Sequence, residues 1–196
     1  MSRDFIIRPV KPMVDAPILL DIYAPYVETT AVTFEYEVPT IKEFRRRIRE
    51  TITHFPYLVA EDDSGILGYA YAHPFHPRVA YSWCVEVSVY IAPDQRKRGL
   101  GRALYDAITE ILRRQGVLLM VVLVASVEGE DPYLCQDSVL FHHKMGFTDV
   151  GTMPQCGYKF NRWYDMTYMI KRIGDAKTDV PPVILYPELK EEEKRK

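Results

Sequence analysis

The chain has 196 residues, of which 47% are hydrophobic and 27% charged, and these proportions are ordinary for a single globular domain. The formal net charge is -2, so the composition does not favour a nucleic acid or a membrane surface as partner. The three cysteines are too few and too scattered for a disulfide framework. The N-terminus lacks the apolar region of a signal peptide, and the longest apolar run, residues 117–125, is too short to span a bilayer. We therefore expect a soluble, cytoplasmic protein.

The first half of the chain predicts a strand, two helices and a hairpin. Residues 5–8 read as a strand, and apolar residues at helical spacing predict a helix over 15–27 with Asp15 as its N-cap. A T-x-x-E capping box that begins at Thr40 opens a second helix over 41–53. Its arginines are expected to lie largely in solvent: Arg45, Arg46, Arg47 and Arg49. The stretches "YLVAED" and "ILGYAYAHPF" flank the turn "DSG" as the strands of a hairpin.

The middle of the chain predicts a strand, a helix and a second strand. Residues 81–91 alternate large apolar side chains with smaller or polar ones, as in a strand whose two faces differ. A helix is expected over 100–115, and Gly116 ends it. The continuous apolar run at 117–125 suits a central strand that is covered on both faces.

The end of the chain predicts a short helix, two strands and a tail. The helix is expected to end at Gly146, and the strands lie near 147–153 and 164–171. Residues 174–196 contain prolines and then many charges, so we expect this tail to fray. The sequence therefore predicts one α/β domain with a mixed sheet over 1–173, followed by the tail.

A basic loop with two glycines joins the strand at 81–91 to the next helix. It contains neither the Gly-Lys-Ser/Thr of a P-loop nor a complete G-x-G-x-x-G, because Leu104 stands at the third glycine position. Taken alone, "RKRGLGR" could equally be a connection with solubilising arginines. Because it leaves a strand and enters a helix, its backbone N–H groups and the positive end of the helix dipole point toward one place. That context predicts a site for phosphate groups.

Several stretches resemble one known family. The pattern Arg96-x-x-Gly99-x-Gly101 resembles the acetyl-CoA signature of the GNAT acyltransferases. The segment "PFHPRVAYSWCVEVSVYI" (74–91) is similar to the phosphinothricin and methionine-sulfone N-acetyltransferases of that superfamily, and "TTAVTFE", "FHHKMGF" and "GYKFNRWYD" extend the similarity to residues 4–171. The resemblance implies the GNAT fold, an α/β (α+β) architecture. Its mixed, mostly antiparallel sheet is flanked by helices, and the strands at 81–91 and 117–125 splay apart.

For the donor, the resemblance implies acetyl-CoA. The basic loop would hold the pyrophosphate, through Arg96, Lys97, Arg98, Gly99, Leu100, Gly101 and Arg102. The strand after Glu86 would meet the pantetheine arm, through Val87, Ser88, Val89 and Ile91, and residues 122–125 would line its other side. Ser138 would be a further cofactor contact. Cys135 replaces an asparagine that many family members carry, which places one expected contact in doubt.

For catalysis, the resemblance implies that Glu86 is the general base, acting directly or through a water. A base is needed because an ammonium has no lone pair with which to attack a thioester. An isolated glutamate on an alternating strand is more often exposed, but Trp83, Cys84 and Tyr90 are poor surface residues. His142 occupies the position of the family's tyrosine and would protonate the departing thiolate. It could equally be a surface histidine of its helix.

For the amine, the resemblance implies a pocket shaped by Phe34 and Glu35, with His76 and Arg78 facing the acidic end of the substrate. His76 replaces an arginine of the family pattern, so phosphinothricin need not be the substrate. His73-x-x-His76 could be a metal pair, but it lacks a further ligand at suitable spacing, and no metal is expected.

The sequence thus predicts an acetyl-CoA-dependent N-acetyltransferase that acts on the α-amine of a small L-amino acid or analogue. The expected partners are this amine and a second copy of the chain, because family members are commonly homodimers. Two alternatives remain at this point. The amine could be a protein N-terminus or a polyamine, or the chain could be a non-catalytic module that binds acyl-CoA.

Overall fold

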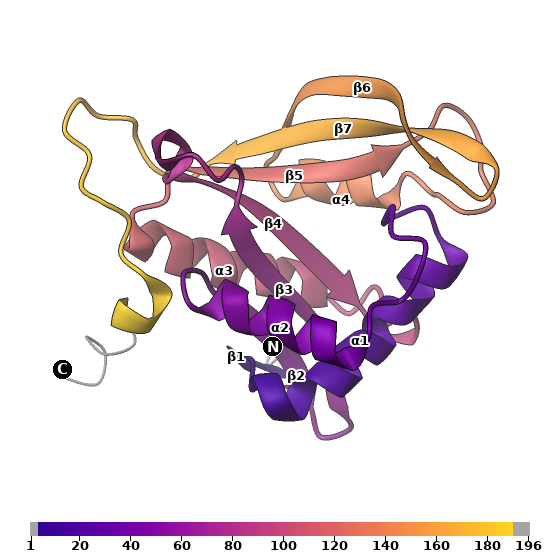
Figure 1. The fold of residues 1–196 in the computed structure, drawn as a ribbon, viewed down its shortest axis with the longest axis horizontal. Coiled ribbons are helices and arrows are strands. Elements are labelled where there is room, and N and C mark those ends of the chain that lie inside the picture. The colour runs from indigo at the N-terminus through magenta and orange to yellow at the C-terminus, as the bar shows by residue number, and fades with distance from the viewer. Residues whose placement is uncertain (1–3, 190–196) are drawn as a thin grey trace.

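The computed structural model describes residues 4–189. Seven strands form one sheet in the order β1-β2-β3-β4-β5-β7-β6 (Figure 1). The strands are β1 (Ile6–Pro9), β2 (Tyr57–Asp62), β3 (Gly65–Pro74), β4 (Cys84–Ile91), β5 (Leu119–Ser126), β6 (Thr148–Lys159) and β7 (Arg162–Arg172). The helices are α1 (Pro12–Thr29), α2 (Ile41–Ile52), α3 (Leu100–Gln115) and α4 (Asp137–Lys144), with short 3-10 turns at Val79–Tyr81 and Pro93–Gln95. The mixed sheet flanked by helices was predicted and is confirmed.

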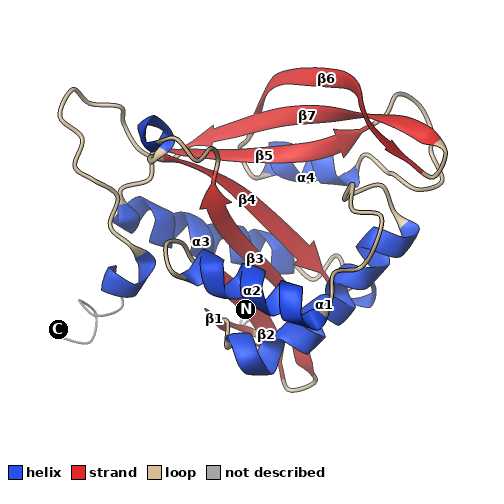
Figure 2. Cartoon of the chain, in the orientation of Figure 1, coloured by secondary structure: helices blue, strands red, loops and turns tan. Residues whose placement is uncertain are grey.

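Helices cover both faces of the sheet (Figure 2), and an apolar core lies on each face. On one face, Val85 and Val87 of β4 pack with Leu104 and Ile108 of α3. On the other face, Tyr69 of β3 packs with side chains of α1 and α2, and Tyr90 of β4 contacts this cluster. The predicted alternation of β4 therefore divides its side chains between the two cores. The strand begins at Cys84 rather than at residue 81, because residues 79–81 form a 3-10 turn in which Tyr81 N–H donates to the Arg78 carbonyl.

Local signals mark most helix ends correctly. Thr40 caps α2 by accepting a hydrogen bond from the Glu43 N–H at 3.2 Å, and Gly116 ends α3 in the left-handed conformation, with φ 86°. Asp15 is not the cap of α1, which begins earlier, at Pro12. Proline is well tolerated in the first turn of a helix, and the Asp15 carboxylate instead accepts from the Lys11 N–H at 2.6 Å.

The C-terminal hairpin and tail differ from expectation. Strands β6 and β7 extend into a two-residue turn at Phe160 and Asn161, which both have positive φ. This turn lacks the glycine that usually signals a hairpin. The tail does not fray over 184–189, where Ile184 N–H donates to the Gln115 carbonyl and Tyr186 is buried. The charged residues 190–196 lie outside the described range. Within residues 4–189, no helix is long and apolar enough to cross a membrane.

Candidate active site

The parallel strands β4 and β5 separate at Glu86. They pair only from Cys84 with Leu119 to Glu86 with Val121, although both strands continue beyond this point (Figure 1). Antiparallel pairs surround them, so this one interface of the sheet opens while its neighbours stay closed. The separation leaves backbone N–H and C=O groups of both strands without a partner strand, and such groups require hydrogen bonds. The predicted splay is therefore present.

A cavity of about 90 Å³ lies in this opening, and we call it the slit. It is lined from β4 by Val87, Ser88, Val89 and Tyr90, from β5 by Val122, Leu123, Val124 and Ala125, and from α4 by Ser138, Phe141 and His142. Residues predicted to contact acetyl-CoA, from β4, β5 and α4, thus meet around one cavity. Ile91 does not line the slit, but it packs at the edge of the core on the α3 side.

The glycine loop meets the N-terminus of α3 near the slit. Gly99 is the N-cap of α3 and has φ 78°, a conformation that favours glycine. Gly101 is required for a different reason, because a Cβ there would lie 3.0 Å from Cζ of Phe141, which lines the slit. The first N–H groups of a helix have no partner inside the helix, so the start of α3 can bind an anion. Leu100 contributes only its backbone, since its side chain is buried in the core.

The basic side chains of this loop are not equally available. The Arg98 guanidinium donates to Asp62 Oδ2 at 3.0 Å, so part of its charge is already compensated. The Arg96 guanidinium lies 5.6 Å above the ring of Tyr26. Lys97 and Arg102 are exposed. We infer that Lys97 and Arg102 are the cations best placed to attract phosphate groups.

Glu86 lies at the point of separation, on the sheet face that packs against α1 and α2. Its side chain is 24% exposed, and its Oε1 lies 3.5 Å from Nε2 of His73 on β3. His73 and Glu86 are directly paired across the antiparallel β3–β4 ladder. A carboxylate at the end of the slit is therefore partly accessible and has a histidine within ion-pair distance.

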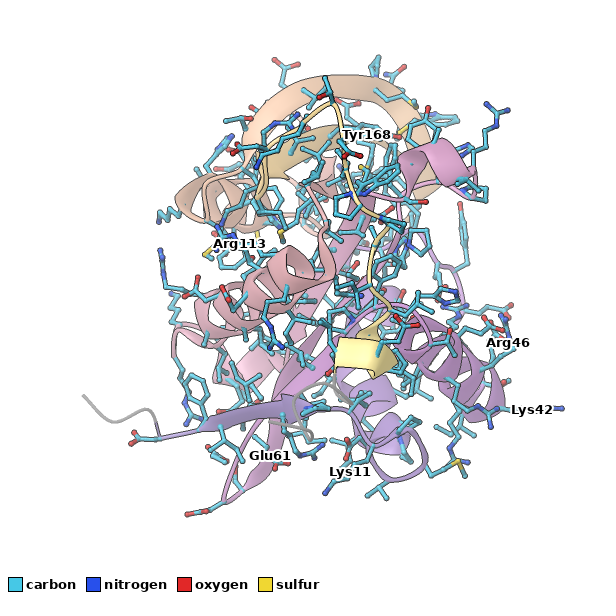
Figure 3. All side chains as sticks on the ribbon, turned by 90° about the vertical axis from the view of Figure 1, so that its left-hand side faces the viewer. Lys11, Lys42, Arg46, Glu61, Arg113 and Tyr168 are labelled. Carbon is cyan, nitrogen blue, oxygen red and sulfur yellow. The ribbon has the colours of Figure 1, made fainter. Side chains whose placement is uncertain are left out.

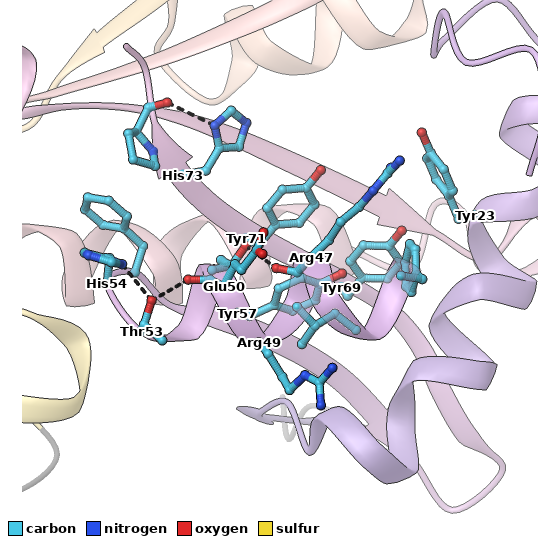
Figure 4. A pocket seen from close by; sticks show the side chains of 15 residues that line it. Tyr23, Arg47, Arg49, Glu50, Thr53, His54, Tyr57, Tyr69, Tyr71 and His73 are labelled. Atoms are coloured by element: carbon cyan, nitrogen blue, oxygen red, sulfur yellow. Dashed lines mark hydrogen bonds between the residues drawn. The ribbon is translucent and has the colours of Figure 1, made fainter. Parts of the chain in front are cut away.

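A second cavity, of about 680 Å³, lies between α2 and the strands β2 and β3 (Figure 4). We call it the α2 cavity. Its aromatic floor is a row of rings that includes Tyr57, Tyr69 and Tyr71, with Tyr57 and Tyr71 stacked at 4.9 Å. His73 and Pro74 also line it, so the cavity extends to the neighbour of Glu86. Burial raises the pKa of the Tyr71 hydroxyl, so this residue remains a neutral hydrogen-bond donor at pH 7.

The predicted substrate residues fall into two groups. Glu35 is brought to the α2 cavity, because its Oε1 accepts from Nη1 of Arg47, a lining residue, at 2.5 Å. Oε2 of Glu35 is buried and finds no hydrogen-bond partner in the described part of the chain. Phe34 packs against the tip of the β6–β7 hairpin, where a Cβ at Gly157 would overlap its ring.

His76 and Arg78 belong to the second group, which lines neither cavity. They lie between β3 and the 3-10 turn, where the Arg78 N–H donates to Nδ1 of His76 at 3.3 Å. The ring of His76 also lies 4.9 Å from that of Tyr81. Arg78 is exposed. The structure therefore does not bring these two residues together with Glu35.

His142 is buried rather than on the helix surface, with 6% exposure. Its Nδ1 lies 2.7 Å from the Ser138 carbonyl, which can only accept, so Nδ1 carries the hydrogen. Its Nε2 then accepts from the Tyr105 hydroxyl at 2.8 Å. Burial lowers the pKa of His142 to about 4, so the ring is neutral at pH 7. Both nitrogens are thus occupied, and this placement does not support His142 as a direct proton donor.

Three contributors to the site were missed. Arg47 was expected in solvent, but it crosses the α2 cavity toward Glu35, between the Tyr71 and Tyr23 side chains (Figure 4). The spacing of Glu43 and Arg47, which pair at 3.0 Å along the helix, was the available signal. Tyr105 lines the slit from α3, and His73 was considered only as a metal ligand. Among the described residues, no group of three or more His, Cys, Asp or Glu side chains is arranged to hold a metal.

Comparisons with known proteins agree with this geometry. The family model described as an acetyltransferase (GNAT) domain matches residues 10–168. Phosphinothricin N-acetyltransferase of Alcaligenes faecalis is 38% identical over 168 residues, which cover 85% of this chain and 82% of that protein. L-methionine sulfoximine/L-methionine sulfone acetyltransferase of Pseudomonas paraeruginosa is 38% identical over 160 residues, covering 79% of this chain and 87% of the relative.

A solved structure extends the agreement to three dimensions. The phosphinothricin acetyltransferase of Sinorhizobium meliloti, crystallised with acetyl-CoA, superimposes with a TM-score of 0.82 at 28% identity. The match covers 94% of this chain and 97% of that one. A match to the family model over most of the chain, together with these relatives, leaves one assignment. This chain belongs to the GNAT family of acetyltransferases, which use acetyl-CoA.

Proposed function

We propose that this protein transfers the acetyl group of acetyl-CoA to the α-amine of a small L-amino acid or analogue. The observation that carries the proposal is the position of Glu86. It stands where β4 and β5 separate, beside His73 of the α2 cavity, while Ser88 lines the slit two residues further along. An amine in the α2 cavity and a thioester in the slit would meet at this carboxylate.

The donor side fits acetyl-CoA. The open edges of β4 and β5 present backbone groups that suit the amide-containing pantetheine arm, and the glycines bring the start of α3 close to a pyrophosphate. When bound, acetyl-CoA supplies a thioester that an amine can attack. N–H groups of β4 beyond Glu86 are the donors available to polarise its carbonyl.

The reaction needs two proton transfers, and we propose a different residue for each. Glu86 takes a proton from the substrate ammonium and so creates the neutral amine that attacks. His142 was predicted to protonate the thiolate, but it holds no hydrogen on the nitrogen that faces Tyr105. We therefore propose that the Tyr105 hydroxyl, which lines the slit, is the donor and that His142 orients it.

The substrate class follows from the relatives and from the α2 cavity. The relatives named above act on phosphinothricin and on methionine sulfoximine or sulfone, all amino-acid analogues. We propose that Arg47 binds the carboxylate of the amino acid and that the unpartnered Oε2 of Glu35 accepts from a polar group. Phe34 lines neither cavity and packs against Gly157 of β6, so no substrate contact is proposed for it. His76 and Arg78 would reach the substrate only if the loop between β3 and β4 moves.

We also propose that the protein is a cytoplasmic homodimer. The C-terminal hairpin exposes several large apolar side chains, and its edge strand β6 has no neighbour on its outer side in the described sheet. Trp163 is 57% exposed, and Tyr158, on the paired strand, is 42% exposed. Clusters of exposed aromatic residues are typical of interfaces.

A panel of amines tests the function. Purified protein and acetyl-CoA are mixed with L-amino acids, methionine sulfone, phosphinothricin, a polyamine and a peptide with a free N-terminus, and thiol release is followed. We expect turnover with amino acids, and mass spectrometry should show acetylation of the α-nitrogen. Turnover with the peptide or polyamine alone would assign a different amine. Calorimetric binding of acetyl-CoA without turnover on any amine would indicate a non-catalytic module.

A further inference from the structure

His73 and Glu86 form a pair at the border of the α2 cavity, next to Tyr71. They are cross-strand partners, so both side chains leave the same face of the sheet. Nε2 of His73 lies 3.5 Å from Oε1 of Glu86, which is ion-pair range and slightly long for a good hydrogen bond. Catalytic contacts are often this long before substrate binds and tighten afterwards. His73 also lines the cavity, with 37% of its side chain exposed, whereas Glu86 is 24% exposed.

The second nitrogen of His73 determines how many protons the pair holds. Nδ1 lies 3.1 Å from the Pro74 carbonyl, which can only accept, so Nδ1 carries a hydrogen (Figure 4). Nε2 therefore faces Glu86 either as a bare lone pair or as an N–H. A lone pair against a carboxylate is repulsive, and one proton placed between the two atoms makes the contact attractive. The geometry favours a pair that takes up one proton readily.

We propose that His73 is a positioning and proton-relay residue for Glu86. Glu86 receives the proton of the substrate amine, and His73 takes it from Glu86 and passes it to solvent in the α2 cavity. The inference rests on the proposed function. The N–H bond of the ammonium breaks as an O–H bond forms on Glu86. That O–H bond then breaks as Nε2 of His73 gains the proton, and the imidazolium releases it to water. No oxidant, reductant or further reactant is needed, and Glu86 returns to the carboxylate.

The surroundings of the pair allow this role. Burial lowers the pKa of His73, but the hydrogen bond and charge of Glu86 outweigh it, and the net pKa is raised above its ordinary value of 6.5. Other titratable side chains also line the α2 cavity: Tyr23, Arg47, Arg49, Glu50, His54, Tyr57, Tyr69 and Tyr71. His76 follows β3 and does not line the cavity. Arg47 is engaged with Glu35 and Glu43, and His54 with Thr53. Within the described residues, His73 is the one basic side chain that lies within ion-pair distance of Glu86.

The relay has a definite pH dependence. Below its pKa, His73 already carries the proton and cannot accept another, so kcat/KM should fall as the pH falls through that value. Deprotonation of the free amine also raises kcat/KM with pH, but it does so equally in every variant. The difference between wild type and a variant at position 73 therefore isolates the contribution of His73.

The experiment compares three variants over pH 5.5–9 with the best amine from the panel. His73→Gln retains a polar side chain of similar reach but cannot take up a proton. His143→Gln is the matched control, because His143 is an exposed histidine on α4 whose Nε2 lies 2.9 Å from the carboxylate of Asp149 on β6. Glu86→Gln removes the base itself. Calorimetric binding of acetyl-CoA confirms that each variant is folded.

We expect His73→Gln to lower kcat/KM by roughly tenfold to 100-fold near pH 8, less than the roughly 10²–10⁴-fold of a direct general base, because Glu86 itself remains. Its profile should also lack the acid limb due to His73, while His143→Gln keeps the wild-type profile. An unchanged profile in His73→Gln, with Glu86→Gln inactive, overturns the relay and leaves the proposed function intact. Full activity of Glu86→Gln overturns the proposed function instead.

A titration without substrate gives an independent reading. The imidazole of His73 is followed by NMR in wild type and in Glu86→Gln, with signals assigned by comparison with His73→Gln. We expect the pKa of His73 to fall when Glu86 is neutralised, because the carboxylate is what raises it. An identical pKa in both proteins shows that the two side chains are uncoupled and refutes the proposal, even if His73→Gln does not fold.

Discussion

The slit lies between β4 and β5, the α2 cavity lies between α2 and the strands β2 and β3, and the two are built differently. The slit is formed by two strands that separate and by glycines that allow a close approach to α3, so it depends mainly on the backbone. The α2 cavity is formed by side chains from α1, α2, β2 and β3. A backbone site offers the same groups whatever the neighbouring side chains are. A side-chain site changes with each substitution, so we propose that the choice of amine resides in the α2 cavity.

The charges of the two sides differ as well. In the slit, His142 is neutral and buried, and the cations of the glycine loop are outside, toward solvent. Two pairs of titratable side chains lie in or beside the α2 cavity: Arg47 with Glu35, and His73 with Glu86. The donor side thus attracts anions at its mouth. On the amine side, we propose that the charged groups of a zwitterionic amino acid replace contacts within these pairs.

Among these variants, we expect Glu86→Gln to have the largest effect, because Glu86 lies between the slit and the α2 cavity. We expect kcat/KM to fall about 10²–10⁴-fold, because the amine then has no base to accept its proton. The affinity for acetyl-CoA should remain unchanged, since the side chain faces the amine side. Steady-state kinetics and calorimetry on the same preparation measure the two effects, and undiminished kcat/KM would remove Glu86 from the mechanism.

Acid destabilisation from His142 tests the buried, neutral character of the slit. Its pKa is about 4 in the folded protein, against an ordinary value of 6.5, so between these values the unfolded chain binds a proton that the folded chain does not. Stability should therefore fall by on the order of 3 kcal/mol as the pH drops from about 6.5 to about 4. His142→Gln should show a smaller loss in urea unfolding across this range. The same loss in both proteins would mean that His142 is protonated in the fold.

Gly101→Val targets the donor side alone. Its Cβ would lie 3.0 Å from Phe141, so the ring must move into the slit. We expect the KM for acetyl-CoA to rise about tenfold, with a loss of about 1–3 kcal/mol in stability from overpacking. Gly151→Val is the matched control, because nothing lies within 4 Å of a Cβ at that position. Equal acetyl-CoA kinetics in the two variants would separate Gly101 from the donor site.

Arg47→Met targets the amine side and should have the smallest effect. It removes the partner of Glu35, and we expect the KM for the amino acid to rise roughly three- to tenfold, or about 1 kcal/mol, while the KM for acetyl-CoA stays constant. Arg46→Met is the control from the same helix, because Arg46 projects away from the body of the protein (Figure 3). A parallel rise in both KM values would indicate a general loss of structure.

Local patterns were sufficient for most elements. Thr40, Gly116 and the hairpin turn after Asp62 place their boundaries where short-range hydrogen bonding and backbone conformation require them. The turn at Phe160 and Asn161 was missed, because it contains no glycine and one of its positive φ angles falls on Phe160, a bulky residue that rarely adopts it. The packed part of the tail was missed because its partners, such as Gln115 and His54, are distant in the sequence.

For the site, the sequence by itself was enough to predict that the residues assigned to acetyl-CoA lie near one another. A glycine loop between a strand and a helix, with one carboxylate on that strand, specifies a local geometry, because strand and helix directions follow from the chain. The tertiary structure alone decided the amine side. His73 meets Glu86 through the register of β3 and β4, and Arg47 meets Glu35 through the packing of α2 against the loop before it. It also decided that His142 is buried and neutral, because burial depends on what packs against a residue.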